Sequence, residues 1–81
     1  MLSRIIFDYS KLKGRITEKL GTQKVFADMM GISESALSTK LNCDTYFSQK
    51  QILKAAGILG IEEAEIGVYF FTQAVQETEQ E

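Results

Sequence analysis

Four hydroxyl side chains and one carboxylate lie close together in the sequence, shortly after Gly31. A hydroxyl both donates and accepts hydrogen bonds, whereas an ionised carboxylate only accepts them. Side chains of this kind suit the recognition of a polar partner through hydrogen bonds. The residues concerned are Ser33, Glu34, Ser35, Ser38 and Thr39.

Catalytic chemistry has little support in the sequence. The chain has no histidine and a single cysteine, Cys43, so neither a zinc site nor a histidine general base is expected. No GxSxG, SxxK or phosphate-binding glycine loop is present. We therefore expect a protein that is not an enzyme and that has no catalytic residues, metal, cofactor or small-molecule ligand.

The composition favours one small helical domain. The 81 residues are 44% hydrophobic and include no proline, and strong helix formers dominate the middle of the chain. Cys43 has no partner for an internal disulfide, and neither a signal peptide nor an apolar run of membrane-spanning length is apparent. These features predict an all-α protein of the cytoplasm without a membrane partner.

The net charge of −2 hides an uneven distribution along the chain. Residues 1–54 hold all nine lysines and arginines against five acids, which gives +4, whereas residues 55–81 hold six glutamates and no base, which gives −6. A basic segment followed by an acidic one favours contact between the basic segment and nucleic acid. The alternative is an ordinary solvated surface with an acidic tail.

Capping residues and apolar stripes predict five helices. They run from Ser10 to Gly21, over 23–30, over 34–42, from a cap at Ser48 to Gly60, and over 62–67. The expected N-caps are Ser10, Thr22, Ser33 and Ser48, the last forming a capping box with Gln51. We divide the chain into an N-terminal arm (1–9), a helical domain (10–71) and an acidic tail expected to be disordered (72–81).

The second and third predicted helices must meet at an abrupt corner. Such a corner needs a small residue facing the partner helix and a positive φ in the turn, which Ala27 and Gly31 supply. Ile32 is expected to fill the corner from the turn.

Residues 23–42, and above all "GISESALSTKLN", resemble the helix-turn-helix of the lambda-repressor-like (XRE and Cro) family, especially its small phage-type repressors. The resemblance covers about residues 8 to 71 and implies a compact domain of four to five helices, with the helix-turn-helix at helices 2 and 3. Two positions depart from the family pattern. Lys40 stands where an apolar residue is expected, with Leu41 taking over the apolar contact, and Cys43 stands where glycine is frequent.

The resemblance also implies which residues contact DNA. The start of the third helix would enter the major groove, where the base-contacting residues would be Ser33, Glu34, Ser35, Ser38 and Thr39. The phosphate-contacting residues would be Gln23, Lys24, Lys40, Asn42 and Lys50. From the residues alone, Glu34 is equally an acid favoured by the dipole of the first helical turn, and each lysine an ordinary solvated charge.

One helix-turn-helix covers few base pairs, so a homodimer on paired half-sites is expected, at least on DNA. The dimer surface would come from the end of the fifth predicted helix and the apolar residues that follow it: Ile66, Val68, Tyr69, Phe70 and Phe71. The other interpretation is that the phenylalanines close the core of the monomer.

The function that these expectations favour is that of a sequence-specific transcriptional regulator, a Cro-like repressor of a phage or prophage. It would bind double-stranded operator DNA in the nucleoid of a bacterial host. The main alternative is a protein-interaction module on the same fold, an antirepressor or adaptor, since a fold does not fix a function. An antitoxin that binds DNA and also covers a toxin is a further alternative.

Overall fold

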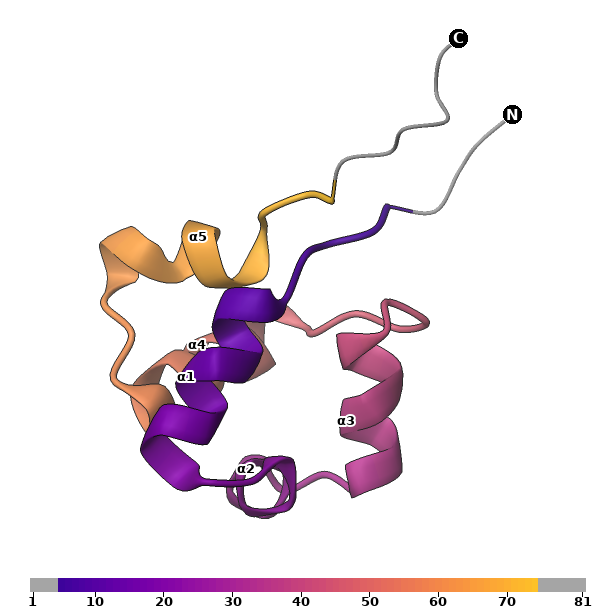
Figure 1. Ribbon diagram of the computed structural model, residues 1–81, viewed down its shortest axis with the longest axis vertical. Coiled ribbons are helices and arrows are strands. Elements are labelled where there is room, and N and C mark those ends of the chain that lie inside the picture. The colour runs from indigo at the N-terminus through magenta and orange to yellow at the C-terminus, as the bar shows by residue number, and fades with distance from the viewer. Residues whose placement is uncertain (1–4, 75–81) are drawn as a thin grey trace, which may run out of the picture.

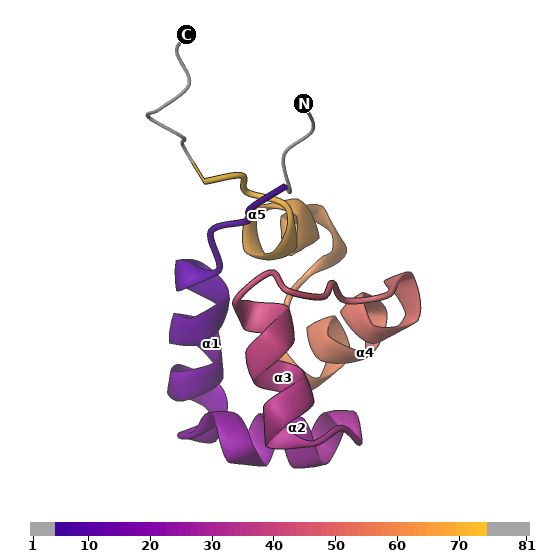
Figure 2. The same cartoon turned by 90° about the vertical axis from the view of Figure 1, so that its right-hand side faces the viewer.

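The structure, a computed structural model, describes residues 5–74. Within this range the chain forms five α-helices and one short 3-10 helix, which agrees with the predicted all-α class. They are α1 (Ser10–Leu20), α2 (Gln23–Met30), α3 (Glu34–Leu41), α4 (Gln49–Leu59), η1 (Glu63–Glu65) and α5 (Ile66–Phe70). Helix α1 packs against α2, α4 and α5, and α3 stands beside α2 on the other side of the corner (Figures 1 and 2).

Local hydrogen bonds explain where three of the helices begin, and they match the predicted caps. The hydroxyl of Thr22 accepts a hydrogen bond from Val25 N at 3.3 Å. Ser33 Oγ accepts one from Ala36 N at 3.0 Å. At α4, Ser48 Oγ accepts from Gln51 N while Gln51 Oε1 accepts from Ser48 N, which completes the capping box.

The predicted cap at Ser10 was wrong. Helix α1 begins at Ser10 itself, and no side chain of its N-cap residue accepts a backbone N–H. Instead the carboxylate of Asp8 accepts hydrogen bonds from both the backbone N–H and the hydroxyl of Ser10. Ser10 is thus the first helical residue and not the cap, and the carboxylate of Asp8 accepts the backbone N–H that the helix leaves free there.

The corner between α2 and α3 has the predicted geometry. Gly31 has φ 79° in the left-handed region, and the backbone N–H of Ile32 donates to Ala27 O at 3.0 Å. Ala27 is fully buried, in the helix that packs against α1, α3 and α4. The corner therefore holds α3 at the edge of the molecule with one face exposed (Figure 2).

The rotation of α3 follows from its two buried leucines. Leu37 and Leu41 lie one turn apart and are almost wholly buried. Lys40 is turned sideways, and its ammonium donates to Tyr46 O at 3.4 Å. Leu41 thus makes the apolar contact that the family pattern assigns to the preceding position.

The fifth helix differs in extent from the prediction of 62–67. A 3-10 turn precedes it, and α5 then continues through Gly67 to Phe70. Gly67 does not adopt a positive φ and so does not end the helix. Phe70 is only 2% exposed and packs edge-on against Phe47, with ring centroids 5.5 Å apart. Burial of this aromatic ring explains why the helix extends beyond the glycine.

The two ends of the described chain pair with each other. Phe7 and Gln73 form an antiparallel bridge, in which Asp8 N donates to Thr72 O at 2.7 Å and Ala74 N donates to Ile6 O at 2.9 Å. Residues 72–74, assigned to the tail on sequence grounds, are thus hydrogen-bonded to the arm. The remainder of the predicted tail (75–81) and the start of the arm (1–4) lie outside the described residues.

Candidate recognition surface

Helix α3 exposes part of the hydroxyl-rich set that the sequence singles out. Glu34, Ser35 and Ser38 are exposed on its outer face, and no other side chain of the described residues bonds to them. Ser33 is exposed, but its hydroxyl caps the helix. Thr39 is half-buried, and its hydroxyl donates to Ala36 O at 2.8 Å and bonds to Thr45 Oγ1. Three of the five predicted base-contacting side chains therefore remain available to a partner.

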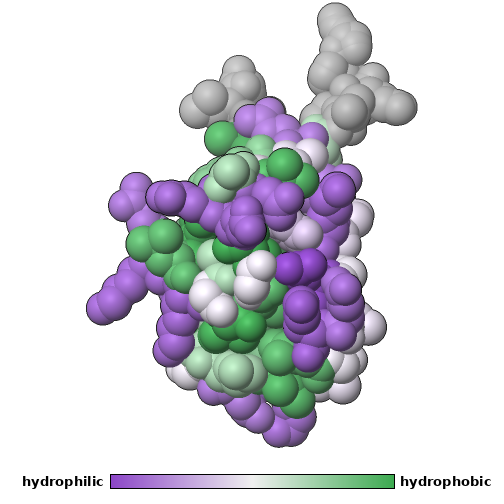
Figure 3. All heavy atoms as spheres, turned by 90° about the vertical axis from the view of Figure 1, so that its left-hand side faces the viewer, coloured by the Kyte–Doolittle hydropathy of each residue, from purple (hydrophilic) through white to green (hydrophobic). Residues whose placement is uncertain are grey.

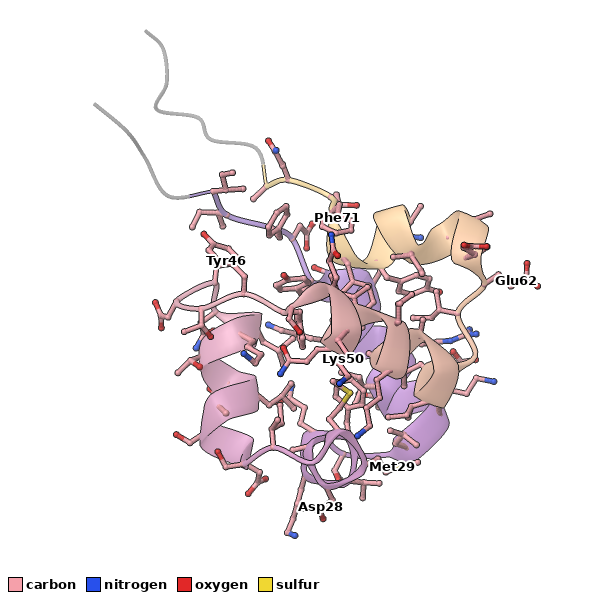
Figure 4. All side chains as sticks on the ribbon, turned by 180° about the vertical axis from the view of Figure 1, so that it is seen from behind. Asp28, Met29, Tyr46, Lys50, Glu62 and Phe71 are labelled. Carbon is pink, nitrogen blue, oxygen red and sulfur yellow. The ribbon has the colours of Figure 1, made fainter. Side chains whose placement is uncertain are left out.

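The predicted phosphate-contacting residues lie on or next to α2, α3 and α4 and differ in availability. Lys24 forms an ion pair with Asp28 at 3.4 Å on the exposed side of α2, and Lys40 is engaged with the carbonyl of Tyr46. The remaining three are exposed at helix ends: Gln23 at the start of α2, Asn42 after α3 and Lys50 in the first turn of α4. Figure 4 labels Lys50 beside α4.

The net charge of this region is zero. From residue 22 to residue 50 the chain carries three lysines and three acids, namely Lys24, Lys40 and Lys50 against Asp28, Glu34 and Asp44. The excess of positive charge lies on α1 instead. This helix carries one acid, Glu18, and four basic residues: Lys11, Lys13, Arg15 and Lys19. Because phosphate neutralisation supplies much of the affinity of DNA-binding proteins, the segment 22–50, which includes α2 and α3, has less positive charge than such binding normally uses.

Two of the basic side chains stabilise the fold. Arg15 donates from Nε to Leu59 O at 3.0 Å and from Nη2 to Gly60 O at 2.9 Å, and thereby caps α4. Lys54 donates to Met30 O, the last carbonyl of α2, at 3.3 Å. Cations are favoured at helix C-termini by the helix dipole and by free carbonyls. Sequence reasoning missed both because each partner lies more than twenty residues away in the chain.

Helix α2 carries an exposed apolar pair that the sequence analysis did not predict. Val25 and Met29 lie one turn apart and are 40% and 47% exposed. The other apolar residues of the helix, Phe26, Ala27 and Met30, are all buried. Met29 lies at the outer end of the molecule beside Asp28 (Figure 4). The α2–α3 surface, defined here as Val25, Met29 and the exposed residues of α3, combines apolar, hydroxyl and acidic groups.

The predicted dimer residues fall into two groups. Phe70 belongs to the core, and Ile66 and Tyr69 pack against it while partly exposed. The guanidinium carbon of Arg15 lies 6.0 Å from the centroid of the Tyr69 ring. Val68 and Phe71 are 45% and 53% exposed. On the face turned away from α3, apolar surface appears as separate patches among hydrophilic side chains (Figure 3).

Among the described residues, no helix is long and apolar enough to cross a membrane. The same residues contain no group of three histidine, cysteine or acidic side chains that would hold a metal ion.

The profile of the family described as "Protein of unknown function (DUF739)" matches residues 5–73. The chain belongs to this family. Its structure is similar to the solution structure of the modulator of repression (MOR) of the temperate bacteriophage TP901-1 from Lactococcus lactis, with 48% sequence identity and a TM-score of 0.69. The match covers 80% of this chain and 88% of that one. No curated protein sequence matches the chain.

This similarity agrees with the predicted fold and with the predicted kinship to small phage regulators. The family that matches is DUF739, whereas the likeness to the lambda-repressor-like family rests on the helix-turn-helix residues alone.

Proposed function

We propose that this chain modulates repression in a temperate phage or prophage by binding a protein, the DNA-binding repressor, with its α2–α3 surface. The observation that carries the proposal is the absence of net charge over residues 22–50, because a protein that reads an operator alone normally uses a positive surface. The 48% identity to a modulator of repression supports the regulatory role.

The chemistry of the α2–α3 surface supports a protein partner of basic character. Val25 and Met29 supply exposed apolar area, and a thioether adapts readily to an irregular partner surface. Glu34 at the start of α3 would be repelled by phosphate but attracted to arginine or lysine. A DNA-binding repressor presents such basic groups on the surface that it uses for DNA.

Direct DNA binding is the second candidate, and one observation favours it. The corner at Gly31 resembles the turn of a helix-turn-helix, and Ser35 in the first turn of α3 and Ser38 in the second are exposed, where a recognition helix would meet base edges. In that case Gln23, Asn42 and Lys50 would contact phosphates, and Glu34 would accept a hydrogen bond from cytosine. The antitoxin alternative depends on the acidic tail, most of which lies outside the described residues.

The test measures binding of the chain to the purified repressor of the same phage or prophage by isothermal titration calorimetry. We expect a saturable complex that the double variant Val25→Asp, Met29→Asp weakens at least about tenfold, since charges would replace buried apolar side chains at the interface. Val68→Asp is the matched control because Val68 is equally exposed but lies on α5. No heat of binding with a folded, active repressor would reject the proposal.

A further inference from the structure

A shallow apolar groove lies between α4 and α5, away from the α2–α3 surface. It encloses about 280 Å³ and is lined by Gln49, Ile52, Leu53, Ile66 and Phe71. Four of these five side chains are apolar. The volume falls just below the range of roughly 300–1,000 Å³ that is usual for small-molecule pockets, and the groove is open to solvent. It suits apolar side chains of a macromolecule better than an enclosed ligand.

Leu53 and Phe71 form exposed walls of the groove, and Phe71 is packed against a neighbouring ring. Leu53 is 65% exposed, the highest value among the large hydrophobic residues of the described chain, and Phe71 is 53% exposed. Phe71 packs edge-on against Phe7, with ring centroids 6.0 Å apart. Figure 4 shows Phe71 directly above α4. Ile52 is almost buried and forms the floor. The groove is therefore present in the structure of the chain without a partner.

The segment that leads into the Ile66 side of the groove is negatively charged. Glu62, Glu63 and Glu65 precede Ile66, are all exposed, and form no ion pair within the described residues. On the α4 side, Lys50 is exposed, whereas the ammonium of Lys54 is engaged with Met30 O. A partner that fills the groove would gain from basic side chains along the edge that faces η1.

The same charges argue against a second copy of the chain as the occupant. Two copies meeting groove to groove would bring together six carboxylates from η1 and only two unengaged ammonium groups from Lys50. Like charges placed at an interface disfavour association. A basic partner avoids this repulsion.

We propose that the α4–α5 groove binds an amphipathic helix of a partner protein, with an apolar stripe seated on Leu53 and Phe71 and lysine or arginine side chains facing η1. Helices commonly bind such grooves through apolar residues spaced three and four apart. This binding site is independent of the α2–α3 surface and of the partner proposed for it.

The test uses the full chain and a fluorescein-labelled designed peptide of roughly 16 residues, about four helical turns, with leucines at helical spacing and lysines along one edge. Fluorescence anisotropy measures its affinity, and amide chemical shifts measured by NMR locate it. We expect shifts at Ile52, Leu53, Ile66 and Phe71. Leu53→Asp should weaken binding at least about tenfold, and Val68→Asp should not.

A peptide with glutamates in place of its lysines distinguishes this site from a merely sticky surface. We expect the acidic peptide to bind more weakly than the basic one. A triple variant should bind both peptides with equal affinity; its substitutions are Glu62→Gln, Glu63→Gln and Glu65→Gln. Equal binding of both peptides, shifts located elsewhere, or no binding of the basic peptide would overturn the proposal. The proposal would also be overturned if the amide chemical shifts of the groove residues changed with protein concentration in the absence of peptide, because the occupant would then be a second copy of the chain.

Discussion

Lys54 on α4 and Met30 at the end of α2 are joined by a hydrogen bond: the ammonium of Lys54 donates to the last carbonyl oxygen of α2 at 3.3 Å. By charge counting, Lys54 belongs to the basic segment that favours contact with DNA. In the structure it ends a helix and positions the corner at Gly31. The ammonium group of Lys54 therefore stabilises the fold and is not free to contact a partner.

Replacing Lys54 with methionine should therefore destabilise the protein. The variant keeps most of the apolar stem and loses the charged donor at the end of α2, so we expect a loss of about 0.5–1 kcal/mol in the free energy of unfolding. Urea denaturation followed by circular dichroism measures it. Lys50→Met is the control, because Lys50 is exposed and has no partner within the described residues. Equal stability of the two variants would contradict the capping role.

Cys43 should show an inverted preference between alanine and glycine. It has φ 64° while almost wholly buried, and its thiol bonds to Phe7, accepting from the backbone N–H and donating to the carbonyl. Both substitutions lose these contacts, but only glycine avoids the left-handed strain of about 1–2 kcal/mol. We expect Cys43→Gly to be about 1 kcal/mol more stable than Cys43→Ala, measured by thermal and urea unfolding. A more stable alanine variant would argue against a strained backbone at this position.

Tyr9 should make the protein sensitive to alkali. Burial raises the pKa of its phenol from 10.0 to about 12, so the folded state favours the neutral form. The resulting stabilisation is present below pH 10 and is lost as the pH rises from 10 toward 12. Tyr9→Phe cannot ionise, so the variant should gain stability relative to the parent across this interval. Urea unfolding of both proteins between about pH 9 and pH 12 measures the difference. A constant difference across that interval would contradict the assignment.

The part of the fold that sequence reasoning predicted depends on contacts between residues a few positions apart. The caps at Thr22, Ser33 and Ser48 and the turn at Gly31 are of this kind, and the bounds of α2 follow from them. Features set by distant partners were missed. The cap that Arg15 places on α4 spans more than forty residues of sequence, and no local pattern marks it.

The candidate surfaces divide in the same way. The hydroxyl residues and Glu34 on α3 could be predicted as recognition residues because they follow a turn that the sequence shows at Gly31. The exposure of Val25 and Met29 was not predicted, because the sequence of a short helix does not show which of its apolar residues are exposed. The α4–α5 groove was missed because it needs Phe71 held by Phe7, a contact between the two ends of the described chain.

The central claim is that the chain acts on repression through a protein and not through its own contact with an operator. The most direct test is fluorescence anisotropy of a labelled operator duplex, with the chain added alone and then with the repressor of the same phage or prophage, at two salt concentrations. We predict no difference between the operator and a scrambled duplex for the chain alone, and a shift of at least about tenfold in repressor–operator affinity once the chain is present. Tight, operator-specific binding of the chain alone that weakens steeply with salt would contradict the claim.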